Sequence, residues 1–224
     1  MGSVNRIRRF FDSLAPRYDG LKQRQEFYGQ ALQALAAELA GPAANGAALE
    51  LGCGTGRLLR ALAPSRGLGV DFSPAMIEQA RSRPAPGIEY AVADIVSYLP
   101  PCAFNLVLCC DVLEHLPDIR PLFSNFRRYP GSPRFVLTWP NPRWFPAMRI
   151  GEWIGAKTPE GPLFERRLRA ACRLAAQNGL RVERSGYRLL LPGGPRRLRD
   201  RLNQLHRDGL LRSWGLIQYL VLSK

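Results

Sequence analysis

The sequence predicts an α/β fold: a Rossmann-like sheet of seven mostly parallel strands with helices on both faces. Short apolar segments alternate along the chain with segments of helical periodicity, which is the pattern of βαβ units. A glycine-rich turn, residues 50–56, stands between the first strand of this pattern and the helix after it. With 224 residues, 46% of them hydrophobic, the chain can bury a core without disulfides or structural metals.

The expected elements follow one another in a regular order. Apolar residues recur at helical spacing from residue 23 to residue 40, and Gly41-Pro42 ends that helix. Further helices are expected at 57–62, 74–83 and 163–178, and strands at 47–51, 67–70, 90–93, 104–110, 135–139, 181–191 and 216–222. We expect residues 1–40 to form an N-terminal helical lid and residues 41–224 a single α/β domain.

Two insertions into this domain are predicted. Residues 140–162 carry five prolines among aromatic residues, which predicts an irregular cap after the fifth strand. Residues 192–213 form a basic amphipathic segment, in which Leu198, Leu202 and Leu205 share one helical face. The polar side chains available to its other face are Arg197, Arg199, Arg201 and His206. Such a helix can lie on an anionic membrane or receive an acidic carrier; leucines packed on the sheet are the alternative.

The charge of the chain is strongly positive and unevenly distributed. The formal net charge is +14, and residues 164–212 hold 13 arginines against four acids. Nucleic acid, an anionic membrane or an acidic substrate would explain it, and so would compositional drift towards arginine. The N-terminus has no apolar signal segment, no apolar run reaches the roughly 20 residues that span a bilayer, and five cysteines lack a Cys-x-x-Cys pair. We therefore expect a cytoplasmic protein without a metal site.

Acidic residues stand at the ends of successive strands. Asp71 ends the second expected strand, where a carboxylate can accept hydrogen bonds from ribose hydroxyls; capping of the next helix is its alternative role. Asp94 and Asp111 follow the third and fourth strands, so all three lie at the sheet edge where open α/β folds bind ligands. The turn reads Gly-x-Gly-x-Gly rather than the Gly-x-Gly-x-x-Gly of dinucleotide-binding folds, which disfavours NAD.

Several segments resemble the class I S-adenosylmethionine-dependent methyltransferases, especially their ubiquinone/menaquinone-biosynthesis-like branch. The matching segments are 11–19 (FDSLAPRYD), 48–56 (ALELGCGTG), 69–76 (GVDFSPAM), 93–94 (AD) and 104–116 (FNLVLCCDVLEHL). The resemblance implies S-adenosylmethionine as cofactor, with S-adenosylhomocysteine as product. The cofactor-binding residues that it implies are Tyr18, Glu50, Gly52, Cys53, Gly54, Gly56, Asp71, Phe72, Met76, Asp94, Ile95 and Cys110.

The resemblance also implies what the residues before and after the turn do. Glu50, Gly52 and Gly54 would surround the methionine part of the cofactor, and the backbone at Cys110 would meet its amino group. Asp71 would bind the ribose.

For the adenine, the resemblance implies Phe72 and Met76 beside the ring and Asp94 on its amino group. Tyr18 would close over the sulfonium end, which makes it one of two candidate catalytic residues. His115 is the other, as a general base near the end of the fourth strand.

Aromatic residues beyond the fifth strand predict an apolar acceptor pocket. The substrate-binding residues expected there are Trp139, Asn141, Trp144, Phe145 and Trp153. The expected activity is in-line methyl transfer to a small apolar or aromatic acceptor, such as a natural product or a quinone or lipid precursor. An RNA methyltransferase and a non-catalytic S-adenosylmethionine-binding module are the alternatives; without an added RNA-binding domain, nucleic acid is not favoured. The sequence indicates no oligomeric state.

Overall fold

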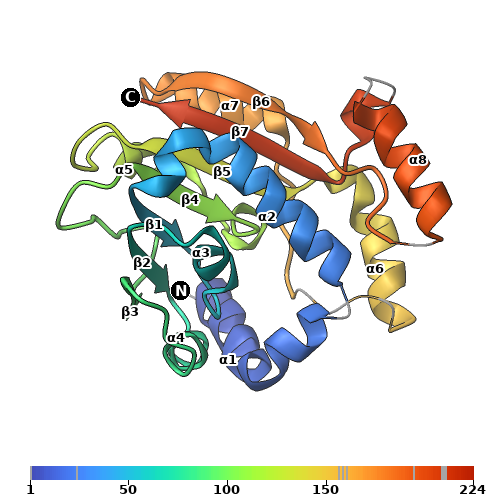
Figure 1. Cartoon of the computed structure of the whole chain (residues 1–224), viewed down its shortest axis with the longest axis horizontal. Coiled ribbons are helices and arrows are strands. Elements are labelled where there is room, and N and C mark those ends of the chain that lie inside the picture. Colours follow the sequence, from blue (N-terminus) through green and yellow to red (C-terminus); the bar gives the residue numbers. More distant parts are fainter. Residues whose placement is uncertain are drawn as a thin grey trace.

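The structure, a computed structural model, describes residues 2–23, 25–155, 157, 159, 161–193, 195–207 and 211–224. Seven strands form one sheet in the order β3-β2-β1-β4-β5-β7-β6 (Figure 1). They are β1 (Ala47–Leu51), β2 (Arg66–Asp71), β3 (Ile88–Val92), β4 (Leu106–Cys110), β5 (Arg134–Pro140), β6 (Arg181–Arg188) and β7 (Ile217–Ser223). β7 runs antiparallel to both β5 and β6, and the other neighbouring pairs are parallel. The predicted mostly parallel sheet is confirmed.

Helices cover both faces of the sheet, as predicted. Because successive side chains of a strand point to opposite faces, Leu106 and Leu108 of β4 pack on one face, and Val107 and Cys109 on the other. The helices on the first face are α2 (Glu26–Ala40), α3 (Arg57–Leu62) and α4 (Pro74–Arg81). Those on the second are α5 (Arg120–Phe126) and α7 (Leu168–Gln177). β4 is buried along its whole length, which explains its continuous apolar sequence.

The helix α1 (Gly2–Gln23) lies outside these two layers, beside α4 (Figure 1). Its apolar residues Ile7, Leu14 and Ala15 are buried, while its arginines Arg8 and Arg9 are exposed. The described part of the predicted lid, residues 2–40, is therefore two helices, α1 and α2.

The segment after β5 is more regular than the sequence predicts. It holds a short 3₁₀ helix, η3 (Pro142–Trp144), followed directly by α6 (Phe145–Trp153). Two of the five prolines that predict irregularity, Pro142 and Pro146, stand in the first turn of these helices, where the missing N–H has no intrahelical partner to lose. The sixth strand ends at Arg188 rather than at residue 191, because Leu189 takes a left-handed φ of 59°. The remaining 3₁₀ helices are η1 (Gly41–Asn45), η2 (Leu113–His115) and η4 (Arg212–Trp214).

The helix α8 (Arg196–Arg207) meets the rest of the protein through polar side chains. The Asn203 amide bonds the backbone of Leu190 and Leu191, and His206 is buried with its Nε2 3.3 Å from the carbonyl oxygen of Arg212. The arrangement contradicts the expectation that His206 is available to an outer face.

The leucines of α8 lie elsewhere on the helix. Leu198 and Leu205 are exposed, so the alternative in which the leucines pack on the sheet is wrong for both. Arg199 also departs from its predicted outward position, since its guanidinium stacks 3.7 Å from the ring centre of Phe27 in α2. None of the helices in the described ranges has the length and apolar content needed to cross a bilayer.

Candidate functional site

The glycine-rich turn after β1 needs its glycines for backbone geometry. Gly52, Gly54 and Gly56 have φ values of 73°, 52° and 75°, in the left-handed region that side chains with a Cβ rarely adopt. The N–H groups of Gly52 and Cys53 both donate to the carbonyl of Val70. A Cβ on Gly52 would lie 2.4 Å from Cγ2 of Val112. The turn therefore holds bare main chain at the end of β1, where a ligand can approach closely.

A cavity of about 390 Å³ lies at this edge of the sheet, within the size range of small-molecule sites. Eleven of the twelve predicted cofactor residues line it: Tyr18, Glu50, Gly52, Cys53, Gly54, Asp71, Phe72, Met76, Asp94, Ile95 and Cys110. The twelfth, Gly56, begins α3 and packs against the Tyr90 ring. His115 and Asp111 also line the cavity. The structure thus brings together residues that lie up to 97 positions apart in the chain.

Asp71 is a buried acceptor at the centre of this site. Its Oδ2 accepts a hydrogen bond from the N–H of Gly54 (2.9 Å), and its Oδ1 accepts one from the N–H of Ser73 (2.9 Å). Burial raises the pKa of Asp71 to about 6. The helix α4 is capped by Ser73, whose hydroxyl accepts from the N–H of Met76, so Asp71 does not serve as that cap.

Glu50 is the second buried carboxyl of the site. Its Oε2 accepts from the N–H of Leu59 at 3.2 Å, and burial raises its pKa to about 8. Burial also raises the pKa of the Cys53 and Cys110 thiols well above the usual range. These thiols are therefore protonated at neutral pH and are not poised as nucleophiles.

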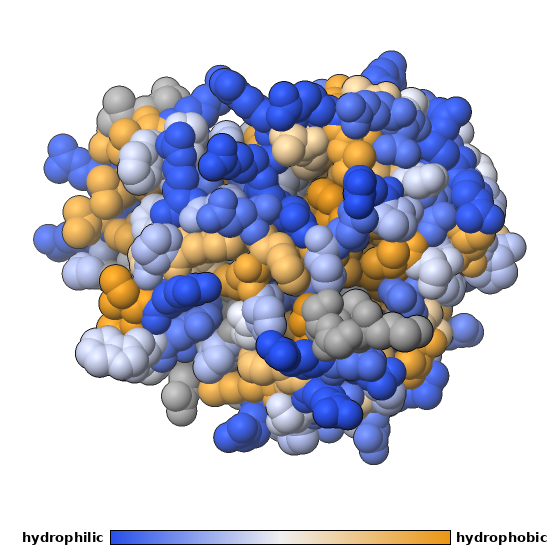
Figure 2. Space-filling model, turned by 180° about the vertical axis from the view of Figure 1, so that it is seen from behind, coloured by the Kyte–Doolittle hydropathy of each residue, from blue (hydrophilic) through white to orange (hydrophobic). Residues whose placement is uncertain are grey.

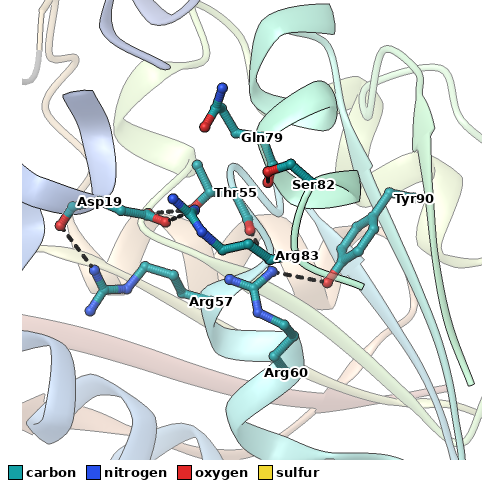
Figure 3. A network of polar contacts seen from close by, with 8 residues as sticks. All are labelled: Asp19, Thr55, Arg57, Arg60, Gln79, Ser82, Arg83 and Tyr90. Carbon is teal, nitrogen blue, oxygen red and sulfur yellow. Dashed lines mark hydrogen bonds and ion pairs between the residues drawn. The ribbon is translucent and has the colours of Figure 1, made fainter. Parts of the chain in front are cut away.

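Polar contacts fasten α1 over the glycine-rich turn (Figure 3). The Asp19 carboxylate accepts a hydrogen bond from the Thr55 hydroxyl at 2.6 Å and forms an ion pair with Arg83. The backbone carbonyl of Asp19 accepts a hydrogen bond from the Arg57 guanidinium. Arg60 donates to the Thr55 carbonyl at 2.8 Å, which ties α3 to the same turn.

About two helical turns before Asp19, a second contact joins α1 to the residues that follow β2. The Ser73 hydroxyl donates to the Asp12 carboxylate at 2.6 Å. We call the Asp12–Ser73 and Asp19–Thr55 contacts the α1 latch. The latch brings Ile7, Phe11 and Tyr18 to the cavity as one of its walls.

A further part of the cavity wall combines aromatic and acidic groups. The Tyr28 hydroxyl of α2 donates to Oδ2 of Asp111 at 2.8 Å. Asp111 has a φ of 54°, an unusual conformation for a residue with a Cβ and one that often marks functional sites. His115 packs edge-to-face on Phe11, and its Nδ1 lies 3.3 Å from the carbonyl oxygen of Pro162.

Sequence reasoning missed the cavity residues of α1 and α2. Ile7, Phe11, Tyr28 and Leu32 line the cavity but were not among the predicted site residues. A signal for two of them exists: Ile7, Phe11 and Tyr18 follow one another at spacings of four and seven, which places them on one helical face.

The five predicted substrate-binding residues do not line the cavity. Trp139 is fully buried in the core beneath α7, and its indole N–H donates to the carbonyl of Arg166. The Asn141 amide donates to the carbonyls of Ser213 and Gly215. The structure therefore assigns packing and loop-fastening contacts to these two residues instead of acceptor contacts.

The other three also lie outside the lining of the cavity. Trp144 donates its indole N–H to the carbonyl of Trp214, Phe145 begins α6, and Trp153 is 87% exposed. The segment after β5 turns towards η4 rather than over the carboxyl ends of the strands. The five residues therefore stand apart from the cavity that the expected cofactor residues line.

Comparison with known families and proteins gives matches to the part of the chain that contains the glycine-rich turn. Residues 49–129 match a family model described as a methyltransferase domain. A trans-aconitate 2-methyltransferase of Methylobacterium radiotolerans is 41% identical over 75 residues, which are 32% of this chain and 28% of that protein. One from Escherichia coli is 42% identical over 80 residues, 34% of this chain and 31% of that protein. The chain thus spans about 30% of the length of these curated relatives.

Solved structures share the fold over nearly the whole chain. The magnesium protoporphyrin IX methyltransferase of Synechocystis, solved with bound SAH, has 17% identity and a TM-score of 0.68, covering 98% of this chain and 99% of its own. An S-adenosylmethionine-dependent methyltransferase from Mesorhizobium loti has 19% identity and a TM-score of 0.64, covering 88% and 100%. These likenesses show the fold. The family-model match and the curated relatives support the predicted methyltransferase class, but not its narrower ubiquinone/menaquinone branch.

Proposed function

We propose that the protein is a class I, S-adenosylmethionine-dependent methyltransferase that methylates a small, mainly apolar or aromatic acceptor. The match of residues 49–129 to a methyltransferase-domain model supports the class. The observation that carries the proposal is the shared cavity. Eleven predicted cofactor residues form one part of it, and apolar side chains of α1 and α2 such as Ile7, Phe11 and Leu32 form another.

The residues present suit the cofactor. S-adenosylmethionine, when bound, supplies a methyl group on a positively charged sulfur. The turn at Gly52 and Gly54 offers main chain without side-chain obstruction, and each oxygen of Asp71 already takes one backbone bond, which leaves a lone pair for a ribose hydroxyl. Glu50 places a second carboxyl against a ligand that carries positive charge. Phe72 and Met76 would then lie beside the adenine.

The contribution of this chain to the reaction is positioning and exclusion of water. Because the leaving group is already activated, holding the acceptor in line and keeping the site dry provides most of the acceleration. The α1 latch holds Phe11 and Tyr18 over the cavity, which suits both tasks.

His115 is the candidate base for an acceptor that must lose a proton. If its Nδ1 donates to the Pro162 carbonyl, its Nε2 is the nitrogen that can accept that proton, and the Glu114 carboxyl lies 3.9 Å from it. Tyr28 and Asp111, bonded to each other on the same wall, are candidates for orienting the acceptor.

A polycarboxylate acceptor is the second candidate, because the relatives with 41–42% identity are named as trans-aconitate methyltransferases. The charges of the cavity favour the first candidate. Two cationic side chains line the described cavity, Lys22 and Arg57, against six acidic residues: Glu50, Asp71, Asp94, Asp111, Glu114 and Asp118. Glu50, with a pKa raised to about 8, is mostly protonated at neutral pH, but the other five acidic residues still outnumber the two cations. A tricarboxylate would meet net repulsion there.

The test is a methyl-transfer assay over phenols, quinone precursors, amines and trans-aconitate, with S-adenosylhomocysteine as the measured product. We expect turnover with an uncharged aromatic acceptor, reduced strongly in His115→Gln without loss of cofactor affinity. Turnover with trans-aconitate alone would select the second candidate. Cofactor binding with no product from any acceptor would favour the binding module, and methylated RNA would replace the small-molecule acceptor altogether.

A further inference from the structure

Exposed hydrophobic side chains gather at one end of the molecule. Of nine large hydrophobic residues that are exposed in the described ranges, seven lie on α6, α8 and η4 or directly beside them. They are Ile150, Trp153, Ile154, Leu198, Leu205, Leu211 and Trp214, and we call them the apolar patch. Trp153 is 87% exposed, more than any other of the nine. Concentration of large apolar side chains on a surface marks an interaction site.

Contacts between the three elements make the patch one surface. The Trp144 indole N–H at the start of α6 donates to the carbonyl of Trp214 in η4, and Arg143 stacks on the Trp214 ring. His206 of α8 lies against the carbonyl of Arg212, also in η4. Figure 1 shows α6 and α8 at the same end of the molecule, opposite β3 and α4. At that end, Figure 2 shows hydrophobic residues interspersed among hydrophilic ones.

The helix α8 presents its apolar side outwards. Arg199, Asn203 and His206 share the face that contacts the protein. The leucines at positions 198, 202 and 205 repeat the same spacing one residue earlier, so they lie about 100° around the helix from that face. Two of them, Leu198 and Leu205, are exposed. Removing the apolar side of such a helix from water is energetically favourable.

The charge around the patch selects the kind of partner. Residues 143–157 and 195–214 contain nine basic and three acidic side chains, a net charge of +6. The exposed Arg197 and Arg201 stand on α8 next to its leucines. Tryptophan and leucine embedded among arginines suit the interface of an anionic bilayer. Two copies of this surface would repel each other, which disfavours self-association through it.

We propose that the apolar patch docks the protein on the surface of an anionic membrane. This inference does not depend on the proposed acceptor. Docking would bring the membrane close to the cavity, since Pro159, six residues after Trp153, lines it. Arg199 also stacks on Phe27, whose chain neighbour Tyr28 is a cavity residue.

The test is co-sedimentation of the full chain with vesicles of phosphatidylglycerol and phosphatidylcholine, compared with pure phosphatidylcholine vesicles. We expect binding to the anionic vesicles that weakens as salt is added, because exposed charges are screened. Arg197→Gln/Arg201→Gln should weaken vesicle binding roughly 30-fold, because each arginine near an anionic surface contributes about fivefold to the affinity. The matched control is Arg169→Gln/Arg173→Gln, a pair of exposed arginines at the same spacing on α7, which should change binding less than threefold.

A second pair of variants tests the apolar contribution. Trp153→Ser/Ile154→Ser should lose most vesicle binding while keeping its melting temperature, because both side chains are largely exposed. Val92→Ser/Leu99→Ser removes the two exposed hydrophobic residues outside the patch and should bind as wild type. Equal binding to neutral and anionic vesicles, or equal losses in patch and control variants, would overturn the proposal. A concentration-dependent dimer that Trp153→Ser/Ile154→Ser dissociates would replace it with a contact between copies.

Discussion

The peripheral helices α1 and α8 orient their amphipathic sequences in opposite ways. In α1 the apolar residues Ile7 and Leu14 are buried, and carboxylates fasten the helix to the cofactor turn. In α8 the polar residues Asn203 and His206 face the protein, and leucines face solvent. Periodicity therefore predicts that each helix is amphipathic, but the partner of each face depends on which side chains the sheet offers. The cavity side of the molecule hides its apolar residues, and the patch side exposes them.

The strongest test of this contrast compares two tryptophans that stand 14 positions apart in the sequence. Trp139 is fully buried and Trp153 is 87% exposed. We expect Trp139→Ala to lower the free energy of unfolding by about 3–5 kcal/mol, and Trp153→Ala to change it by less than about 0.5 kcal/mol. Urea denaturation measures both, and similar losses in the two variants would contradict the assignment of Trp153 to the surface.

A glycine pair compares the cofactor turn with the patch side at the same backbone conformation. Gly52 and Gly155 both have a φ of 73°, but a Cβ on Gly52 would meet Val112 at 2.4 Å, whereas one on Gly155 meets nothing within 4 Å. Gly155→Ala should cost about 1–2 kcal/mol for the left-handed conformation alone. Gly52→Ala should cost about 2–4 kcal/mol because the clash is added. Thermal melting tests the difference, which vanishes if Val112 can move aside freely.

For the cofactor itself, Asp71→Asn keeps the shape of the side chain and removes its charge. We expect S-adenosylmethionine binding to weaken by about 1.5–3 kcal/mol, the range for hydrogen bonds to charged groups. The patch variant Arg197→Gln/Arg201→Gln should bind the cofactor as wild type. Calorimetric titration decides the matter: an unchanged dissociation constant in folded Asp71→Asn would remove this residue from the site.

The raised pKa of Asp71 predicts a pH dependence of the same site. Since the carboxylate takes up a proton as the pH falls through about 6, cofactor affinity should fall about fivefold between pH 6 and pH 5. The contribution to stability has the opposite sign: a carboxyl whose pKa is raised on folding stabilises the cofactor-free protein most below pH 3.8, and this is lost as the pH rises to about 6. In Asp71→Asn both dependences should be absent, as titrations and melting curves over this range would reveal.

The smallest effect concerns the α1 latch. Asp12→Ala removes the partner of Ser73 and should reduce stability by about 0.5–1.5 kcal/mol. Asp200→Ala on α8, half exposed, should change stability less. Hydrogen exchange should be faster over residues 10–19 in Asp12→Ala and slower there when cofactor is added to the wild type. Identical exchange of this segment with and without cofactor would refute the lid prediction.

Local sequence by itself determined the strands, the glycine-rich turn and the acidic strand ends. Backbone geometry restricts positions such as Gly52 and Gly54 to glycine, and the ends of parallel strands meet at one edge whatever the rest of the chain does. These constraints act within a few residues, so the turn and the strand ends could be placed from the sequence. The resemblance to a known family, and not local geometry, named the eleven expected cofactor residues that line one cavity.

The tertiary structure alone decided where the remaining aromatic and basic side chains lie. The sequence predicted Trp139 and Trp153 to line one pocket, but the antiparallel partner β7 and the helix α7 bury the first, while nothing in the described ranges covers the second. The inward face of α8 depended likewise on acceptors far away in the chain, such as the backbone at Leu190 and the ring of Phe27. Such choices rest on contacts between distant segments, which periodicity along one helix does not encode.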